Sequence, residues 1–248
     1  MWRTLPRGLL LLWGLLGVFW SSFALPSFSL TAPAREVATR IIADERFKRS
    51  ALSEMLARMK IAPRPCVVQP EFSRADALIT LRTAEEVLQR KSSEEADREV
   101  ESAENKIRIG LAMTPSDSFL WLMLYSVQTV RKGFDLPNIA NLDQSYYEGP
   151  NEGWISLRRN RLALAVFPLL SENTQESVIA EFAKMVDSGF IDDAAMNLAG
   201  VGWPYRDRLL SSLQQVDITD RLSLARQLSR DSVKVVVPGT ETEERPWR

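Results

Sequence analysis

The chain has 248 residues, and 31 Lys or Arg nearly balance 32 Asp or Glu. This balance excludes the strongly basic surface that nucleic-acid binding requires. The sequence has no histidine and a single cysteine, Cys66, which excludes histidine-dependent catalysis, intrachain disulfides and thiolate zinc sites. We therefore expect no metal, no cofactor and no catalytic residue.

Residues 1–30 are predicted to form a membrane anchor or a signal segment. Arg3 and Arg7 precede an almost wholly apolar run over residues 8–25. A helix of that length reaches about 27 Å, close to the thickness of the bilayer hydrocarbon core. The positive-inside rule predicts a cytoplasmic N-terminus, with the rest of the chain outside the cytoplasm. The alternative is a cleaved signal peptide, with Ser22-Phe23-Ala24 as a candidate cleavage site.

Residues 31–70 are predicted to contain a charged amphipathic helix followed by a linker. The helix is expected over residues 34–60, where apolar side chains recur at helical spacing. Pro63, Pro65 and Pro70 follow, and prolines at this density end helices and stiffen a linker. We place a domain boundary in this linker.

Residues 71–230 are predicted to form the main helical domain, followed by a tail over residues 231–248. Apolar periodicity and capping residues indicate a series of helices. A β-prone run of valines lies near the start of the tail. No phosphate-binding loop and no succession of strands is found, so the predicted class is all-α. The expected helices cover residues 73–90, 93–113, 119–130, 137–147, 152–167, 172–188, 192–198, 205–215 and 219–230.

Two spacings indicate a repeat within this domain. Trp121 and Trp154 lie 33 residues apart, and Pro115 and Pro150 lie 35 apart. A period near 34 is typical of the tetratricopeptide repeat, and Trp121-x-x-Leu124 matches its opening. The match is incomplete, so we predict a degenerate tetratricopeptide-like array of helical hairpins with Trp121 and Leu124 in its core. The alternative is a generic helical bundle with an accidental spacing.

The run from Gly110 to Phe167 carries a resemblance. It contains GLAMTPSDSFLWLMLYSVQ and, further on, GPNEGWISLRRNRLAL. It resembles small tetratricopeptide-like proteins of bacterial exopolysaccharide and O-antigen gene clusters, which also begin with a leader or anchor. The resemblance covers about a quarter of the chain and implies an accessory role in making or exporting a surface polysaccharide. It provides no catalytic residue. The arginines and the apolar run at the N-terminus predict a single-pass inner-membrane protein whose bulk is periplasmic.

The Gly149–Gly153 segment of that run is a candidate contact with a protein partner. Asn151 is expected to cap the following helix, and Glu152 to lie at its positive end. Gly153 is expected to allow close approach to a neighbouring segment. The alternative is a purely structural turn that sets the angle between two helical pairs.

Three arginines follow this segment. Arg158 and Arg161 share one helix face, and Arg159 points elsewhere. Guanidinium groups suit carboxylates, phosphates and acidic sugars. We expect Asn151, Glu152, Arg158 and Arg161 to contact a partner; the alternative for the arginines is salt bridging to Glu152 or to acids of the previous helix.

Acidic residues provide the test for an enzyme. Adjacent pairs such as Asp192-Asp193 separate onto different helix faces, so we expect them to be solvated. The predicted function is a membrane-anchored extracytoplasmic scaffold for surface-polysaccharide biosynthesis and export. The alternatives are an assembly factor of another envelope complex and a carboxylate-dependent polysaccharide-modifying enzyme. An enclosed pocket with two converging acids would favour the enzyme, whereas a shallow groove lined by arginine and aromatics would favour binding.

Overall fold

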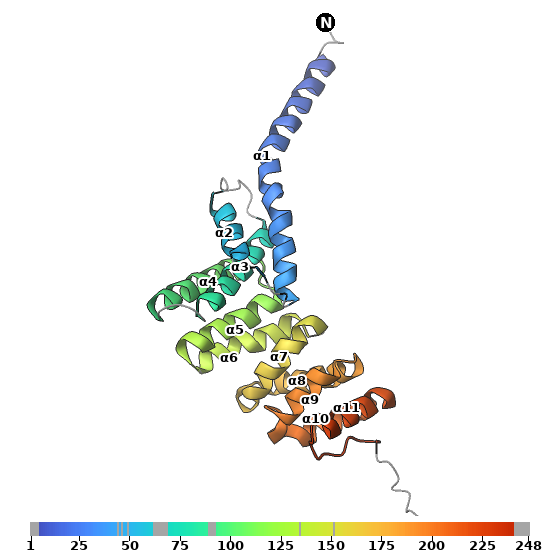
Figure 1. The fold of residues 1–248 in the computed structure, drawn as a ribbon. Helices are drawn as coiled ribbons and strands as arrows, with labels where there is room; N and C mark the ends of the chain where they lie inside the picture. Colours follow the sequence, from blue (N-terminus) through green and yellow to red (C-terminus); the bar gives the residue numbers. More distant parts are fainter. Residues whose placement is uncertain are drawn as a thin grey trace, which may run out of the picture. The chain divides into compact units, whose positions relative to one another are not determined.

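The computed structural model describes residues 5–240 except 44, 46, 49, 62–68, 89–92, 134 and 151. Within this part of the chain the secondary structure is helical, and no strand is found, including at the valines near residue 235. The all-α prediction is confirmed. The chain divides into two compact units, Met1–Pro115 and Ser116–Arg248, and the division falls inside the segment predicted as one helical domain. Each unit is built from helices that pack against their neighbours in sequence (Figure 1).

The first unit contains α1 (Leu5–Ile42), α2 (Ala51–Ile61), α3 (Pro70–Leu88) and α4 (Ser93–Met113). Helix α3 is its centre and packs against each of the other three. Helix α4 buries one apolar stripe, because Ala103, Ile107 and Leu111 are buried at successive turns. Between α3 and α4, the Lys106 ammonium lies 2.6 Å from a carboxylate oxygen of Asp76.

Helix α1 differs from the prediction, because it is continuous through the residues where a separate charged helix was expected to begin. Its C-terminal part buries Ala34, Ala38 and Ile41, at a spacing that places them on one face, and this part packs on α3. Over residues 12–22 every side chain is exposed, and Trp13 and Trp20 are 70% and 68% exposed. None of the helices, as far as their residues are described, has both the length and the hydropathy of a membrane span.

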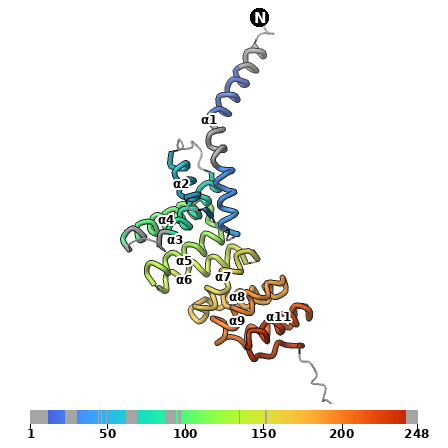
Figure 2. Tube along the Cα trace, viewed as in Figure 1, coloured from blue at the N-terminus to red at the C-terminus, as the bar shows by residue number. Residues whose placement is uncertain are grey.

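The second unit begins with two helical hairpins. Helix α5 (Ser118–Lys132) packs against α6 (Leu136–Glu148), and α7 (Gly153–Ala165) packs against α8 (Glu172–Asp187). The unit continues with α9 (Ile191–Ala199), α10 (Arg206–Ser212) and α11 (Ile218–Arg230). Helix α9 packs against α8 and α11 (Figure 2). Short 3₁₀ turns join the later elements: η1 (Phe167–Leu169), η2 (Trp203–Tyr205) and η3 (Leu213–Gln215).

Residues next to its two ends set the boundaries of α5. Asp117 caps the helix, and its side chain accepts hydrogen bonds from the backbone N–H groups of Phe119 and Leu120, both at 3.1 Å. Gly133 ends the helix with φ of 75°, a conformation that favours glycine.

The predicted core position of Trp121 is wrong, whereas that of Leu124 is confirmed. Leu124 is 2% exposed, but Trp121 is only partly buried. The fully buried residues of α5 include Leu120, Leu122 and Leu124, so this helix buries more than one narrow stripe. The Trp121 side chain lies at the margin of that wide apolar surface, where truncation costs less than it does in a closed core.

Candidate functional site

The predicted partner site lies at the turn between α6 and α7 and along α7. Helix α6 ends at Glu148 with Gly149 as its C-cap, and α7 begins at Gly153, one residue later than predicted. Glu152 occupies the N-cap position, but its side chain makes no capping hydrogen bond. Asn151, the predicted cap, lies outside the described residues.

The glycine that permits close approach is Gly149 and not Gly153. A Cβ atom on Gly149 would lie 2.5 Å from Oγ and 2.6 Å from Cβ of Ser118, at the start of α5. A Cβ atom on Gly153 would meet nothing within 4 Å. The close approach expected at Gly153 therefore occurs at the other end of the turn, where the end of α6 lies against the start of α5.

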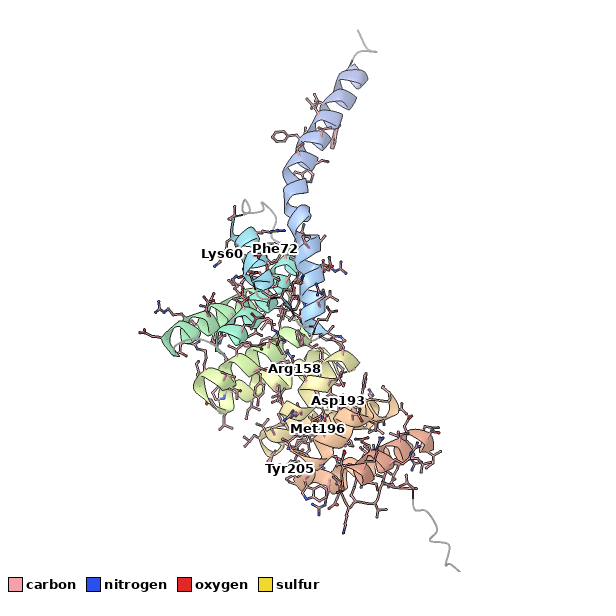
Figure 3. All side chains as sticks on the ribbon, viewed as in Figure 1. Lys60, Phe72, Arg158, Asp193, Met196 and Tyr205 are labelled. Atoms are coloured by element: carbon pink, nitrogen blue, oxygen red, sulfur yellow. The ribbon has the colours of Figure 1, made fainter. Side chains whose placement is uncertain are left out.

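The three arginines of α7 have different environments. Arg158 and Arg161 are exposed, as expected for residues on one outer face, and Figure 3 labels Arg158 on α7. Arg159 has 0% exposure and points into the unit. Its apolar neighbours at the same helical face, Ile155 and Ala163, are also buried. The position of Arg159 between Ile155 and Ala163, at four-residue spacing, is the sequence signal that could have predicted its burial.

Arg159 forms an ion pair with Glu181 of α8, a residue that the sequence reasoning did not single out. Nη2 lies 2.6 Å and Nε 3.0 Å from Oε1 of Glu181. Nη1 donates to the backbone oxygen of Ser145 at 2.8 Å, and Nη2 donates to the backbone oxygen of Gly149 at 2.9 Å. Arg159 therefore caps the end of α6, where carbonyls run out of intrahelical donors. It is a second donor to the Ser145 oxygen, which also accepts the backbone N–H of Gly149 at 3.2 Å, and it donates to the Gly149 oxygen.

The other oxygen of Glu181 also has partners. The Tyr146 hydroxyl donates to Oε2 at 2.6 Å, and the Arg159 guanidinium lies 4.0 Å from the centre of the Tyr146 ring. Burial, and then the nearby Glu181 charge, raise the pKa of Tyr146 well above its usual value, so the phenol stays protonated and remains a donor. Asn160 donates to the Val178 backbone oxygen at 2.9 Å. These groups connect α6, α7 and α8 in one buried polar network.

This network has a structural role rather than a reactive one. Both oxygens of Glu181 accept hydrogen bonds, and the guanidinium of Arg159 donates to a carboxylate and to two backbone carbonyls. A buried ion pair is tolerated only when its remaining donors and acceptors are satisfied in this way. The network therefore fixes α6, α7 and the turn between them against α8.

A small cavity lies beside the turn and is lined by two acids, Glu152 and Glu181. Its volume is about 120 Å³, room for roughly four waters at the volume each occupies in the liquid. Pockets for small organic ligands usually exceed about 300 Å³. Because Glu181 is also held by Arg159 and Tyr146, this cavity does not provide the enclosed pair of available acids that an enzyme acting on sugars needs.

Two larger depressions are open to solvent. One, of about 500 Å³, lies in the second unit between α8 and the end of α10, and includes Glu176 and Asp187. These acids are eleven residues apart on one helix, about 16 Å along its axis, well beyond the roughly 5–9.5 Å that separates the acids of glycosidases. The other, of about 660 Å³, lies beside α1 in the first unit, where Glu71 is 3.5 Å from Arg35.

Metal ligands do not gather in the described part of the chain. No group of three or more His, Cys, Asp or Glu residues there could hold a metal ion. Cys66 lies outside the described residues.

These features define an all-α protein of sequentially packed helical hairpins whose second unit is held by a buried polar network. Comparisons with protein families, with curated proteins and with solved structures find no match.

Proposed function

We propose that the protein is a membrane-anchored, non-enzymatic scaffold that acts outside the cytoplasm in the biosynthesis and export of a surface polysaccharide. The body is proposed to be a degenerate tetratricopeptide-like array. Its partners are proteins of the assembly or export machinery, and the contact involves the α6–α7 turn and α7 through Asn151, Glu152, Arg158 and Arg161.

The observation that carries the membrane part of the proposal is the difference between the two parts of α1. Large apolar side chains over residues 12–20 are between 58% and 70% exposed, whereas the part after Thr31 packs on α3. An exposed apolar surface of this size calls for an apolar environment or a partner. Arg3 and Arg7 at the start of the chain favour a cytoplasmic N-terminus.

The scaffold part is supported by the form of the helical body. Helical hairpins stacked in sequence present extended surfaces for protein partners. The acids near the turn are engaged in the buried network or line a cavity too small for a sugar ligand. The polysaccharide context comes from the resemblance of the Gly149–Gly153 segment and its flanks to proteins of exopolysaccharide and O-antigen gene clusters.

Two experiments test these parts separately. A reporter that is active only outside the cytoplasm, fused after Arg248, is expected to be active, and the full chain is expected to sediment with membranes. Activity of a strictly cytoplasmic reporter at the same position would reverse the topology.

Deleting the chain in the organism that encodes it is expected to reduce or alter the exported polymer. Replacing single exposed carboxylates by amides is expected to leave polymer production intact. A single Asp-to-Asn or Glu-to-Gln change that abolishes production while stability and complex formation are normal would replace the scaffold by an enzyme.

A further inference from the structure

A straight segment follows α11 and runs back along that helix (Figure 1). Residues 233–237 contain no helix, turn or bend, and a turn lies on either side of them. The Val233 N–H donates to the backbone oxygen of Leu228, near the C-terminal end of α11, at 2.8 Å. Near the N-terminal end of α11, Nη1 of Arg221 donates to the backbone oxygen of Pro238 at 2.7 Å. The segment is therefore fixed against one helix at both of its ends.

The side chains of this segment alternate between two sides. Val237 is 1% exposed, and Val233 and Val235 are partly buried. Lys234 and Val236 are exposed, and Val236 retains 64% of its accessible surface. This alternation is that of a β-strand with one face on a core, and β-branched residues are favoured in strands. The segment therefore has the form of a single strand that lacks a partner strand within the described residues.

The two edges of the segment differ in their backbone hydrogen bonds. In an extended chain the N–H and C=O groups of one residue point to one edge, and those of the next residue point to the other. On the first edge the Val233 N–H is bonded to α11, and the Val237 oxygen accepts from the N–H and the hydroxyl of Thr240, at 3.2 and 2.9 Å. On the second edge the N–H and C=O groups of Lys234 and Val236 form no hydrogen bond within the described residues. We call these four groups the Lys234–Val236 edge.

We propose that the Lys234–Val236 edge binds an extended segment of a protein partner as an added antiparallel strand. Donors and acceptors that alternate at this spacing match another extended backbone, and addition of a strand to an open edge is a recurring mode of peptide recognition. The Lys234 ammonium forms no ion pair within the described residues, so the partner strand is expected to place an acidic side chain opposite it. A β-branched side chain is expected opposite Val236. This contact goes beyond the proposed function, because it lies far in the sequence from the α6–α7 turn.

The residues that follow the segment cannot take this edge through the adjoining turn. Gly239 has φ of 75°, and the turn closes with the Thr240 N–H on the Val237 oxygen. A hairpin extended from that hydrogen bond would pair through the edge of Val237 and Val235, because hydrogen-bonded residues alternate along a strand. The Lys234–Val236 edge would remain open to another chain.

The same segment of a second copy is a poorer match than an acidic strand. Lys234 is the only charged residue between Val233 and Val237. Pairing of two copies would therefore leave both ammonium groups without a counter-charge, whereas an acidic strand of a different protein provides one.

The test measures binding of a dye-labelled, acetylated peptide, Thr-Val-Thr-Glu-Thr, to the intact protein in detergent. In the antiparallel register its Val lies opposite Val236 and its Glu opposite Lys234. One modified form carries N-methyl groups on Val and Glu, whose N–H groups would face the edge. The other carries them on the two Thr that follow these residues, whose N–H groups would face away. The first form is expected to bind about tenfold more weakly than the unmodified peptide, and the second to bind about as tightly.

Two proline variants provide a matched comparison within the chain. V236P removes an N–H group from the proposed edge, and V235P removes one from the opposite edge. Proline keeps the residue before it extended, so both changes suit a straight segment, and circular dichroism checks that the helices remain. V236P is expected to bind the peptide about tenfold more weakly, and V235P to bind it as the unchanged protein does. Bound peptide is also expected to slow hydrogen exchange at the amides of Lys234 and Val236 but not of Val235.

The charge of the partner is tested by replacing Glu in the peptide by Gln. The unchanged protein is expected to prefer the Glu peptide, and K234Q to lose that preference, because the ion pair requires both groups. Equal affinity of the unchanged protein for the two peptides would contradict an acidic partner.

Three further results would overturn the proposal. Equal binding of the two methylated peptides, or equal weakening in V235P and V236P, would show that the peptide is not added as a strand at this edge. Self-association that V236P abolishes, without binding of the peptide, would make the edge an interface between two copies of the chain. Each of these results would leave the membrane topology and the effect of deletion on polymer unchanged, so failure here is distinguishable from failure of the scaffold function.

Discussion

Each unit contains an ion pair that bridges two helices, and the two pairs have the same 2.6 Å separation. Lys106 and Asp76 join α4 to α3 with side chains that are 23% and 26% exposed. Arg159 and Glu181 join α7 to α8 with side chains that are 0% and 5% exposed. Water can replace either partner of the first pair, but neither partner of the second. Removing one partner is therefore expected to cost much more stability in the second pair than in the first, although the two distances are equal, because this cost depends on burial.

Removing the buried cation is expected to have the largest effect. The R159M variant leaves Glu181 buried without its counter-charge and removes the guanidinium donor from the carbonyls of Ser145 and Gly149, of which Ser145 keeps the Gly149 N–H. The expected loss is about 3–5 kcal/mol in the free energy of unfolding. Denaturant unfolding followed by circular dichroism measures it. A change of less than about 1 kcal/mol would show that water reaches Glu181.

The double variant R159M/E181M sharpens this result. Replacing a whole buried pair by apolar side chains is often close to neutral. The double variant is expected to recover only part of the stability lost in R159M, because the carbonyls of Ser145 and Gly149 still lack the guanidinium donor. The double variant is therefore expected to lie between R159M and the unchanged protein; full recovery would mean that those two hydrogen bonds contribute nothing to stability.

Tyr146 provides a test that depends on pH. The Y146F variant removes the donor to Oε2 of Glu181 and is expected to cost about 1–3 kcal/mol near neutral pH. Because the pKa of Tyr146 is raised in the folded protein, the folded state retains the phenolic proton more strongly than the unfolded chain. This contribution is complete below the unfolded pKa of about 10 and is lost as the pH rises toward the folded value.

The unchanged protein should therefore lose stability more steeply above pH 10 than Y146F. The pKa of Tyr125 is also raised by burial, so the Y146F variant should still lose some stability as the pH rises above 10. Parallel stability curves for the two proteins above that pH would contradict the buried position of Tyr146.

The close approach at Gly149, in the turn between α6 and α7, can be tested by adding one methyl group. In G149A the new Cβ would lie within 2.6 Å of Ser118, and the expected cost is about 1–3 kcal/mol. The double variant S118G/G149A removes the clashing side chain and is expected to recover part of that loss. The matched change G153A meets no neighbour and is expected to be close to neutral, which separates steric conflict from an effect of the turn sequence.

Substitution in the partly exposed pair, Lys106 and Asp76, is expected to change stability least. Lys106 also donates to Thr80 at 2.9 Å, so K106M removes two contacts, but solvent can hydrate Asp76 in its place. The expected loss is about 1 kcal/mol or less, and added salt should reduce it. A loss as large as that of R159M would show that the two pairs are equivalent and that burial does not explain their difference.

Local sequence patterns predicted the helices of the body well, because helix ends depend on nearby residues. The predicted range 93–113 coincides with α4, and the predicted range 119–130 lies within α5, whose ends are set by Asp117 and Gly133. Where the predictions fail, the cause is packing between distant segments. Trp121 satisfies a spacing pattern but is only partly buried, at the margin of the core.

The sequence by itself determined the helical class, the apolar N-terminal run and the outward positions of Arg158 and Arg161, since these depend on composition and on the 3.6-residue period. Only the tertiary structure decided that Arg159 is the structural arginine and that Gly149 makes the close approach. Their partners, Glu181 and Ser118, lie 22 and 31 residues away in the chain. No local pattern can specify which distant carboxylate or hydroxyl enters the space beside a residue, because that is determined by how the helices pack against one another.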